Sequence, residues 1–281
     1  MATEIPNTEQ FDYWNGPMGE RWASLQEKID ENLKAISDAL FNFAAVKAGE
    51  RVLDLGCGCG TTSFMLEKIV GEKGKVVGID ISNPMLELAH ARAHKHHSHV
   101  SFIEADASVH NFGAHKFDLV FSRFGVMFFD DPVVGFTNIR HAMHHGARLV
   151  FVCWRTMKEN DWANVPYQAA LPLLPPQEAP DPLAPGPFAF ADAARVKTIL
   201  TRSGLKDVAI EKLNTKMYMG STIKSAAEEA MNIGPLAKAA RELDDKTRDK
   251  IRAAVETAYI KFESKDGIAP PAACWLVRAH V

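Results

Sequence analysis

Three glycines at alternate positions, Gly56, Gly58 and Gly60, follow a carboxylate at Asp54. Because glycine has no Cβ atom, this spacing permits a tight turn and lets the backbone approach a bound molecule closely. The apolar residues before the glycines predict a buried parallel strand, and residues 61–70 have the apolar spacing of a helix. A loop between such a strand and helix holds backbone N–H groups against a polar cofactor.

A second carboxylate, Asp80, ends another apolar segment, residues 75–80. In an open α/β sheet, a carboxylate at this position accepts hydrogen bonds from ribose hydroxyls. A dinucleotide and S-adenosylmethionine (SAM) both fit this arrangement. The dinucleotide fingerprint is Gly-x-Gly-x-x-Gly, whereas this loop reads Gly-x-Gly-x-Gly. Asp54 is also unfavourable beside a pyrophosphate but suits the sulfonium and amino groups of SAM, so the residues favour SAM.

Three further segments continue the pattern along the chain: residues 102–107, 117–124 and 146–152. With the two strands above, they make residues 48–155 resemble the class I SAM-dependent methyltransferases, and within them the type 11 or UbiE-like group that acts mostly on small molecules. The resemblance implies an α/β fold with a Rossmann-like methyltransferase sheet of seven strands, the last one antiparallel, and helices on both faces. It also implies SAM as the cofactor and S-adenosylhomocysteine (SAH) as its product.

The resemblance assigns individual residues to parts of the cofactor. It implies that Asp54 and Gly56 lie near the methionine part and that Asp80 binds the ribose. Asp106 would contact the adenine amino group, with Ala107 beside it. We expect the following residues to bind the cofactor: Tyr13, Trp14, Trp22, Asp54, Gly56, Cys57, Gly58, Gly60, Thr61, Asp80, Ile81, Met85, Asp106, Ala107 and Ser122.

The candidate catalytic residues are Ser122, Arg123 and Trp154. Methyl transfer from a sulfonium is an in-line displacement, in which the enzyme mainly aligns the reactants and excludes water. By the resemblance, Ser122 and Arg123 face the methyl group, where Arg123 could orient an acceptor anion. Trp154, just past the fifth strand, is placed to face the acceptor. Asp131 precedes a proline and is better explained as the N-cap of a helix than as a general base.

The composition is that of an ordinary globular protein. The chain has 281 residues, of which 47% are apolar and 24% charged, and its formal net charge is −3. This charge gives no basic footprint for nucleic acid, so we expect a small-molecule acceptor. No apolar run has the length of a signal core or a membrane span, which predicts a cytoplasmic enzyme; a homo-oligomer is possible. The Cys57/Cys59 pair lacks a second pair or a nearby histidine, so we expect no metal.

The first 47 residues predict a helical arm. Apolar residues recur every three or four positions from Trp22 to Phe43, which predicts one long amphipathic helix. Aromatic residues and helix breakers crowd residues 11–19 before it. We favour a lid in which these aromatics fold over the cofactor. The alternative is that they only pack the helix onto the core.

The remaining core, residues 48–281, contains two insertions. Residues 154–190 hold eight prolines, including Pro166 and Pro180, a density that disfavours a long helix. Residues 221–267 have helical periodicity. We expect both insertions to form a cap over the acceptor. Their apolar character predicts an acceptor with a hydrophobic or aromatic body.

Two alternatives to a small-molecule methyltransferase stay open. One is an NAD-dependent oxidoreductase, which the loop spacing and Asp106 disfavour. The other is a SAM-binding regulator without turnover, which would be expected to lose Asp80 or the loop glycines, and the sequence keeps both. Titration with SAM and NAD separates the first alternative, and a screen of methyl acceptors separates the second.

Overall fold

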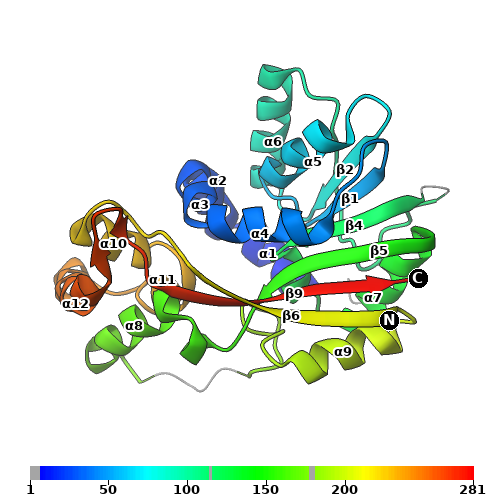
Figure 1. The fold of residues 1–281 in the computed structure, drawn as a ribbon. Coiled ribbons are helices and arrows are strands. Elements are labelled where there is room, and N and C mark those ends of the chain that lie inside the picture. The colour runs from blue at the N-terminus through cyan, green and yellow to red at the C-terminus, as the bar shows by residue number, and fades with distance from the viewer. Residues whose placement is uncertain (1–6, 114–115, 177–180) are drawn as a thin grey trace, which may run out of the picture.

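The computed structural model describes residues 7–113, 116–176 and 181–281. At its centre lies a seven-stranded mixed β-sheet with helices on both faces (Figure 1). Its strands are β1 (Arg51–Leu55), β2 (Lys75–Asp80), β3 (Ser101–Glu104), β4 (Phe117–Arg123), β5 (Met143–Trp154), β6 (Lys206–Lys216) and β9 (Pro271–His280). Their order is β3-β2-β1-β4-β5-β9-β6, and β9 runs antiparallel to both neighbours. The predicted methyltransferase sheet is therefore confirmed.

Helices cover both faces of this sheet, and further helices form the arm and a cap beside it. The helices are α1 (Thr8–Asn15), α2 (Pro17–Ser24), α3 (Gln26–Asn32), α4 (Lys34–Ala44), α5 (Thr61–Val70), α6 (Asn83–His96), α7 (Pro132–His141), α8 (Asp161–Ala170), α9 (Ala193–Arg202), α10 (Ile223–Ala230), α11 (Gly234–Ala239) and α12 (Asp245–Tyr259). α4 and α9 lie on opposite faces of the sheet (Figure 1). Residues 52–55 of β1 and residues 149–154 of β5 are buried, which is why they read as continuous apolar runs.

The predicted helix boundaries agree closely with the structure in the half of the chain that contains the glycine loop. α5 occupies residues 61–70 as expected, and Asp131 caps α7 by accepting hydrogen bonds from the Val133 and Val134 N–H groups. The N-cap of α6 is Ser82.

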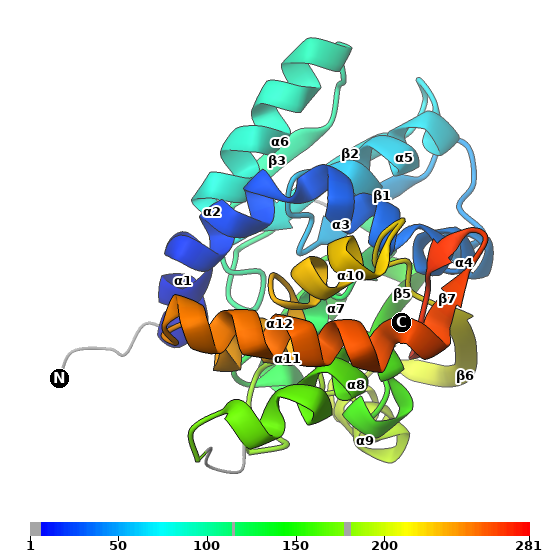
Figure 2. The same ribbon diagram turned by 90° about the vertical axis from the view of Figure 1, so that its left-hand side faces the viewer.

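The arm is not one long helix, and that prediction is wrong. Leu25 and Leu33 leave the helical conformation, with φ/ψ angles of −98°/8° and −93°/2°, and they divide the arm into α2, α3 and α4. The bends let the chain follow the edge of the sheet (Figure 2). Residues 1–6 of the predicted arm lie outside the described residues.

Helices from both insertions pack together into one unit, which we call the cap: α8, α10, α11 and α12. Residues 154–190 were expected to form a loop without a long helix, but they contain α8, a ten-residue helix with Pro166 inside it. Proline has no N–H to offer the Trp162 carbonyl four residues earlier. The Tyr259 hydroxyl, from α12, donates to that carbonyl instead (3.0 Å), which ties the two insertions together. Pro180 lies outside the described residues.

A short antiparallel hairpin, β7 (Glu263–Ser264) and β8 (Gly267–Ile268), links the cap to β9. Within the described part of the chain, no helix is long and apolar enough to cross a membrane.

Candidate functional site

The glycine loop between β1 and α5 is a rigid, backbone-held turn. Gly56, Gly58 and Gly60 have φ angles of 64°, 52° and 83°, a region that L-residues with side chains avoid. A Cβ atom on Gly56 would lie only 2.6 Å from the Cα of Gly125, so two backbone segments meet here without side chains. The Ile79 carbonyl, near the end of β2, accepts from the Gly56 and Cys57 N–H groups. The loop shape is thus fixed by its neighbours.

Asp80 holds the middle of this loop. Its two carboxylate oxygens accept the Gly58 N–H (2.8 Å) and the Ser82 N–H (2.9 Å). The residue is buried, and burial raises the pKa of its carboxyl while these backbone hydrogen bonds lower it in part. Each oxygen keeps acceptor capacity for a further donor, which suits a pair of ribose hydroxyls.

We therefore expect Asp80→Ala to weaken SAH binding roughly tenfold or more, because it removes these acceptors and frees the loop. Isothermal titration calorimetry measures the effect. Asp118→Ala is the matched control: Asp118 also accepts a backbone N–H, from Arg51 at the opposite end of the sheet (2.8 Å). An unchanged dissociation constant in Asp80→Ala, or an equal loss in Asp118→Ala, would contradict the role of Asp80.

Asp54, the carboxylate of β1, is completely buried. One oxygen accepts hydrogen bonds from the Thr62 and Ser63 hydroxyls of α5 (2.7 and 2.6 Å). The other oxygen, Oδ1, has no hydrogen-bond partner among the described residues. Burial raises the pKa of this carboxyl to about 6, although the two hydroxyls and Arg123 lower it in part. A buried acceptor without a donor points to a ligand group that supplies one.

Asp106 repeats this feature after β3. Its Oδ1 accepts the Ser108 N–H (2.8 Å), whereas Oδ2 is buried and has no partner in the described part of the chain. Asp106, Asp80 and Asp54 follow or end three adjacent strands, β3, β2 and β1, so they form a row along one edge of the sheet. Because strands lie about 4.8 Å apart, the row extends about 10 Å, which suits adenine, ribose and methionine in sequence.

Three other predicted cofactor residues lie along this row. Met85 is buried, and its sulfur would be 3.6 Å from a Cβ on Gly58. Ala107 is buried beside Asp106, and its carbonyl accepts the Asn138 amide (3.0 Å). The Ile81 carbonyl accepts the Asn15 amide of the arm (2.8 Å).

A small cavity of about 70 Å³ lies between the glycine loop and the arm. Its lining residues are Trp22, Gln26, Ile29, Leu33, Gly56, Cys57, Gly58, Cys59, Thr61, Thr62, Arg123 and Phe124. Ligand pockets commonly have volumes of about 300–1,000 Å³, so the arm fills much of the space beside the loop. Burial raises the pKa of both loop cysteines, that of Cys59 to about 12.

The three aromatic residues predicted to contact the cofactor differ in their positions. Trp22 lines the cavity. Trp14 packs edge-on against Trp22 and Phe128 with ring centroids 5.7 and 5.2 Å apart, so it lies one layer behind. Tyr13 is hydrogen-bonded to Arg241 beyond α11, and burial raises its pKa. Tyr13 therefore links the arm to the segment that follows the cap helix α11.

The three predicted catalytic residues also differ in their positions. Ser122 is fully buried, donates to the Leu55 carbonyl (2.8 Å) and accepts the Gly125 N–H (3.1 Å), so its hydroxyl holds β1, β4 and the following turn together. Arg123 lines the cavity. Trp154 is the last residue of β5 rather than a residue just past it, and it is buried.

Phe124 is a site residue that the sequence analysis missed. It lines the cavity, and its ring stacks on Trp154 with centroids 4.3 Å apart. Its φ of 67° is unusual for a bulky side chain and stores strain of the kind found at functional sites. The two rings form an apolar wall beside Arg123.

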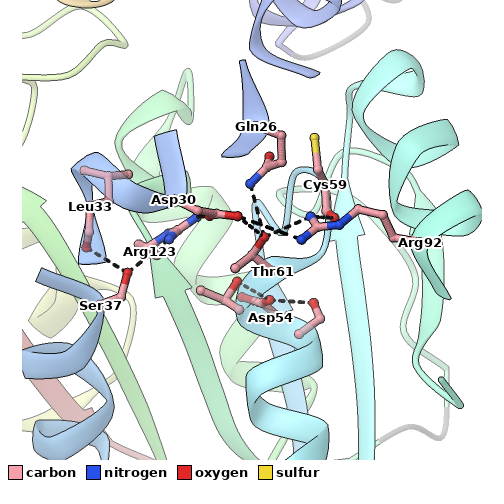
Figure 3. Close-up of polar contacts among 11 residues, drawn as sticks. Gln26, Asp30, Leu33, Ser37, Asp54, Cys59, Thr61, Arg92 and Arg123 are labelled. Carbon is pink, nitrogen blue, oxygen red and sulfur yellow. Dashed lines mark hydrogen bonds and ion pairs between the residues drawn. The ribbon is translucent and has the colours of Figure 1, made fainter. Parts of the chain in front are cut away.

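A second missed feature is a polar network between the arm and the loop (Figure 3). Asp30 of α3 accepts the Thr61 hydroxyl (2.6 Å) and forms an ion pair with Arg123 (3.2 Å). Arg92 of α6 donates to the Cys59 carbonyl and to Thr61 (2.6 and 2.9 Å). One sequence signal was present: Gln26, Asp30 and Ser37 recur at helical spacing beside the apolar stripe of the arm.

Comparison with known proteins identifies the domain in which these residues lie. A family described as "Methyltransferase domain" matches residues 52–146, which contain the glycine loop and all three carboxylates. Aklanonic acid methyltransferase DauC from Streptomyces is 31% identical over 165 residues, 58% of this chain and 62% of its own length. Residues 52–146 of the chain therefore form a methyltransferase domain.

Other relatives agree with this assignment. A demethylmenaquinone methyltransferase from Staphylococcus carnosus is 26% identical over 200 residues, 65% of this chain and 80% of its own length. Among solved structures, a Bacillus halodurans protein shares the fold, with a TM-score of 0.57 at 16% identity, covering 88% of this chain and 98% of its own. The predicted donor class, SAM rather than a dinucleotide, is confirmed for the methyltransferase domain.

No group of three or more His, Cys, Asp or Glu side chains in the described residues is arranged to hold a metal ion. The orphaned oxygens of Asp54 and Asp106 and the glycine cradle are consistent with SAM as the resident cofactor.

Proposed function

We propose that this protein transfers the methyl group of SAM to a small acceptor with a hydrophobic or aromatic body. The observation that carries the proposal is the Phe124 ring, which borders the cavity beside Arg123 and is backed by the stacked ring of Trp154. Flat aromatic surfaces pack well against such rings. Relatives named for aklanonic acid and demethylmenaquinone support an acceptor of this kind.

Each carboxylate has a distinct task in this proposal. Asp54 accepts from the amino group of the methionine part through its free oxygen, Asp80 binds the ribose hydroxyls, and Asp106 accepts from the adenine amino group. When bound, SAM supplies an electrophilic methyl group on a sulfonium. The protein then aligns the acceptor with that methyl group and excludes water, which contributes about 7–11 kcal/mol in well-oriented systems.

No strong base is required by this arrangement. Asp131, the best-placed acidic residue after β4 in the sequence, is used as the cap of α7. Ser122 has both its hydrogen-bonding roles filled within the fold. The acceptor therefore has to arrive as a nucleophile or to lose its proton to solvent. Acidic phenols, enols and neutral amines meet this condition.

The test combines binding with a transfer screen. Calorimetry with SAH and with NAD shows which cofactor binds. Incubation with labelled SAM and a library of phenols, quinols and amines then identifies the acceptor. We expect SAH to bind, NAD not to bind, and aromatic acceptors to be labelled. Tight SAH binding without transfer to any member of the library would instead support a regulator without turnover.

We further propose that the arm is a lid over the cofactor. Figure 2 shows α2 and α3 between α6 and the cap. Asn15 bonds to Ile81 and Asn83 on one side, and Arg21 and Asn32 bond to Asn232 and Glu229 on the other. A cofactor of ordinary size needs more room than the cavity offers, so the arm has to move when it enters.

Deleting residues 1–19 is expected to lower kcat/KM roughly tenfold or more, because water then reaches the reacting groups. The free energy of unfolding should fall much less, since the helix that covers the sheet, α4, stays in place. Steady-state kinetics and urea denaturation measure the two effects. Unchanged kinetics would leave the arm with a packing role only.

A further inference from the structure

The Asp30 carboxylate is held beside the glycine loop by three donors from separate elements. Thr61 at the start of α5 donates its hydroxyl hydrogen (2.6 Å), Arg123 at the end of β4 lies 3.2 Å away, and Arg92 of α6 lies 3.8 Å away (Figure 3). Thr61 and Arg123 also line the cavity. A carboxylate from the arm therefore occupies a cationic position at the edge of the cofactor site.

Each of the two arginines is also held in place by a hydrogen bond to another residue. Arg92 donates to the Cys59 carbonyl (2.6 Å), and Arg123 donates to the Ser37 hydroxyl (3.0 Å). The side chains of Arg123, Asp30 and Arg92 are 13%, 22% and 26% exposed. Charges buried to this extent are weakly screened by salt, and an anion between two guanidinium groups gains charge-assisted hydrogen bonds.

A site suited to a cation lies beside this anion site, and it begins one residue further along the chain. Thr61 contacts Asp30, and the next residue, Thr62, contacts Asp54. Asp54 has a buried oxygen without a partner in the described part of the chain, suited to a cation. An anion site and a cation site separated by adjacent residues match the carboxylate and ammonium groups on the α-carbon of one amino acid.

We infer that Arg92, Arg123 and Thr61 form the subsite for the α-carboxylate of the methionine part of SAM, and that Asp30 is an internal mimic of this group that fills the subsite until the arm moves. The inference rests on the proposed function. It assigns Asp30 a dual effect: its carboxylate closes the arm onto the loop and competes with the ligand for the same donors.

The experiment compares SAH with 5′-methylthioadenosine, which keeps the adenine, ribose and sulfur but has no amino-acid carboxylate. We expect Arg123→Gln and Arg92→Gln each to weaken SAH binding roughly 10- to 100-fold, as for a lost charged hydrogen bond, and to leave methylthioadenosine binding within about twofold of wild type. Asp30→Asn should bind SAH several-fold more tightly and methylthioadenosine as wild type does. All dissociation constants come from calorimetry at one ionic strength.

Arg148→Gln is the matched control, because Arg148 forms a similarly buried ion pair with Glu50 (2.7 Å) away from the cavity. We expect it to bind both ligands normally, and circular dichroism checks that each variant is folded. Equal losses of SAH and methylthioadenosine in Arg123→Gln, or weaker SAH binding in Asp30→Asn, would overturn the inference. A folded wild-type protein that binds neither ligand would instead contradict the proposed function.

Discussion

Replacing Asp54 with asparagine is expected to abolish SAH binding and, at neutral pH, to raise the free energy of unfolding of the ligand-free protein. Burial raises the pKa of Asp54 to about 6 in the folded state, whereas an unfolded aspartate titrates near about 3.9. Because one pKa unit corresponds to about 1.4 kcal/mol, ionised Asp54 costs the fold up to about 3 kcal/mol. Asparagine keeps an oxygen for Thr62 and Ser63 but carries no charge to desolvate.

The free energy of unfolding should also depend on pH in a direction set by the raised pKa of Asp54. Between about pH 4 and pH 6, the unfolded carboxyl is ionised while the folded one still holds its proton, so stability falls as the pH rises through this range. We expect a steeper fall in the wild type than in Asp54→Asn, measured by urea denaturation at several pH values. SAH binding needs the ionised carboxylate, so wild-type affinity should drop about tenfold from pH 7 to pH 5. An Asp54→Asn protein that is less stable at pH 7, or that still binds SAH, would refute the assignment.

Gly56→Ala is expected to be the most damaging single-methyl change in the loop. The methyl group would meet the Gly125 backbone at 2.6 Å, and the residue already has a φ of 64°. Left-handed backbone costs a residue with a side chain about 1–2 kcal/mol, and overpacking adds about 1–3 kcal/mol. Because the clash is with backbone, β1 and the segment after β4 have to separate, and SAH binding should fall together with stability.

Gly71→Ala separates the backbone penalty from the steric clash. Gly71 ends α5 with a φ of 66°, and a Cβ there meets nothing within 4 Å. It should therefore show only the penalty of placing a side chain at its glycine-type backbone angles, about 1–3 kcal/mol, and bind SAH as the wild type does. Denaturant unfolding and SAH calorimetry on both variants measure the difference. Equal losses of stability would mean that the close approach of Gly56 and Gly125 does not matter.

The cofactor half of the fold could be predicted because its signals are local. The strand, the glycine loop and the helix that begins at Thr61 follow one another within about twenty residues, and Asp80 ends the next strand. Each signal depends on spacing along the chain, which the sequence contains in full. The sheet order follows once the fold family is recognised.

The failures are positions where distant contacts override local preference. Leu25 and Leu33 are good helix formers, yet the arm bends at both because it has to contact α6, the loop and the cap. Pro166 is accommodated in α8 because Tyr259, almost a hundred residues later, supplies a donor for the freed carbonyl. Neither partner is visible in the local sequence.

The same reason limits prediction of the site. Ser122 and Arg123 are neighbours in a strand, so their side chains point to opposite faces, and only Arg123 lines the cavity. Periodicity cannot say which of the two faces the ligand. The Asp30–Arg123 pair joins residues 93 positions apart, and nothing in the spacing of either residue predicts the other.

The raised pKa values of the two loop cysteines determine whether the protein is methylated by its own cofactor. Cys57 and Cys59 line the cavity that, under the proposed function, receives an alkylating agent. A thiolate there would be an intrinsic nucleophile in competition with the acceptor. With its pKa at about 12, Cys59 is ionised in about one molecule in 10⁵ at pH 7. Burial thus protects the loop from methylating itself.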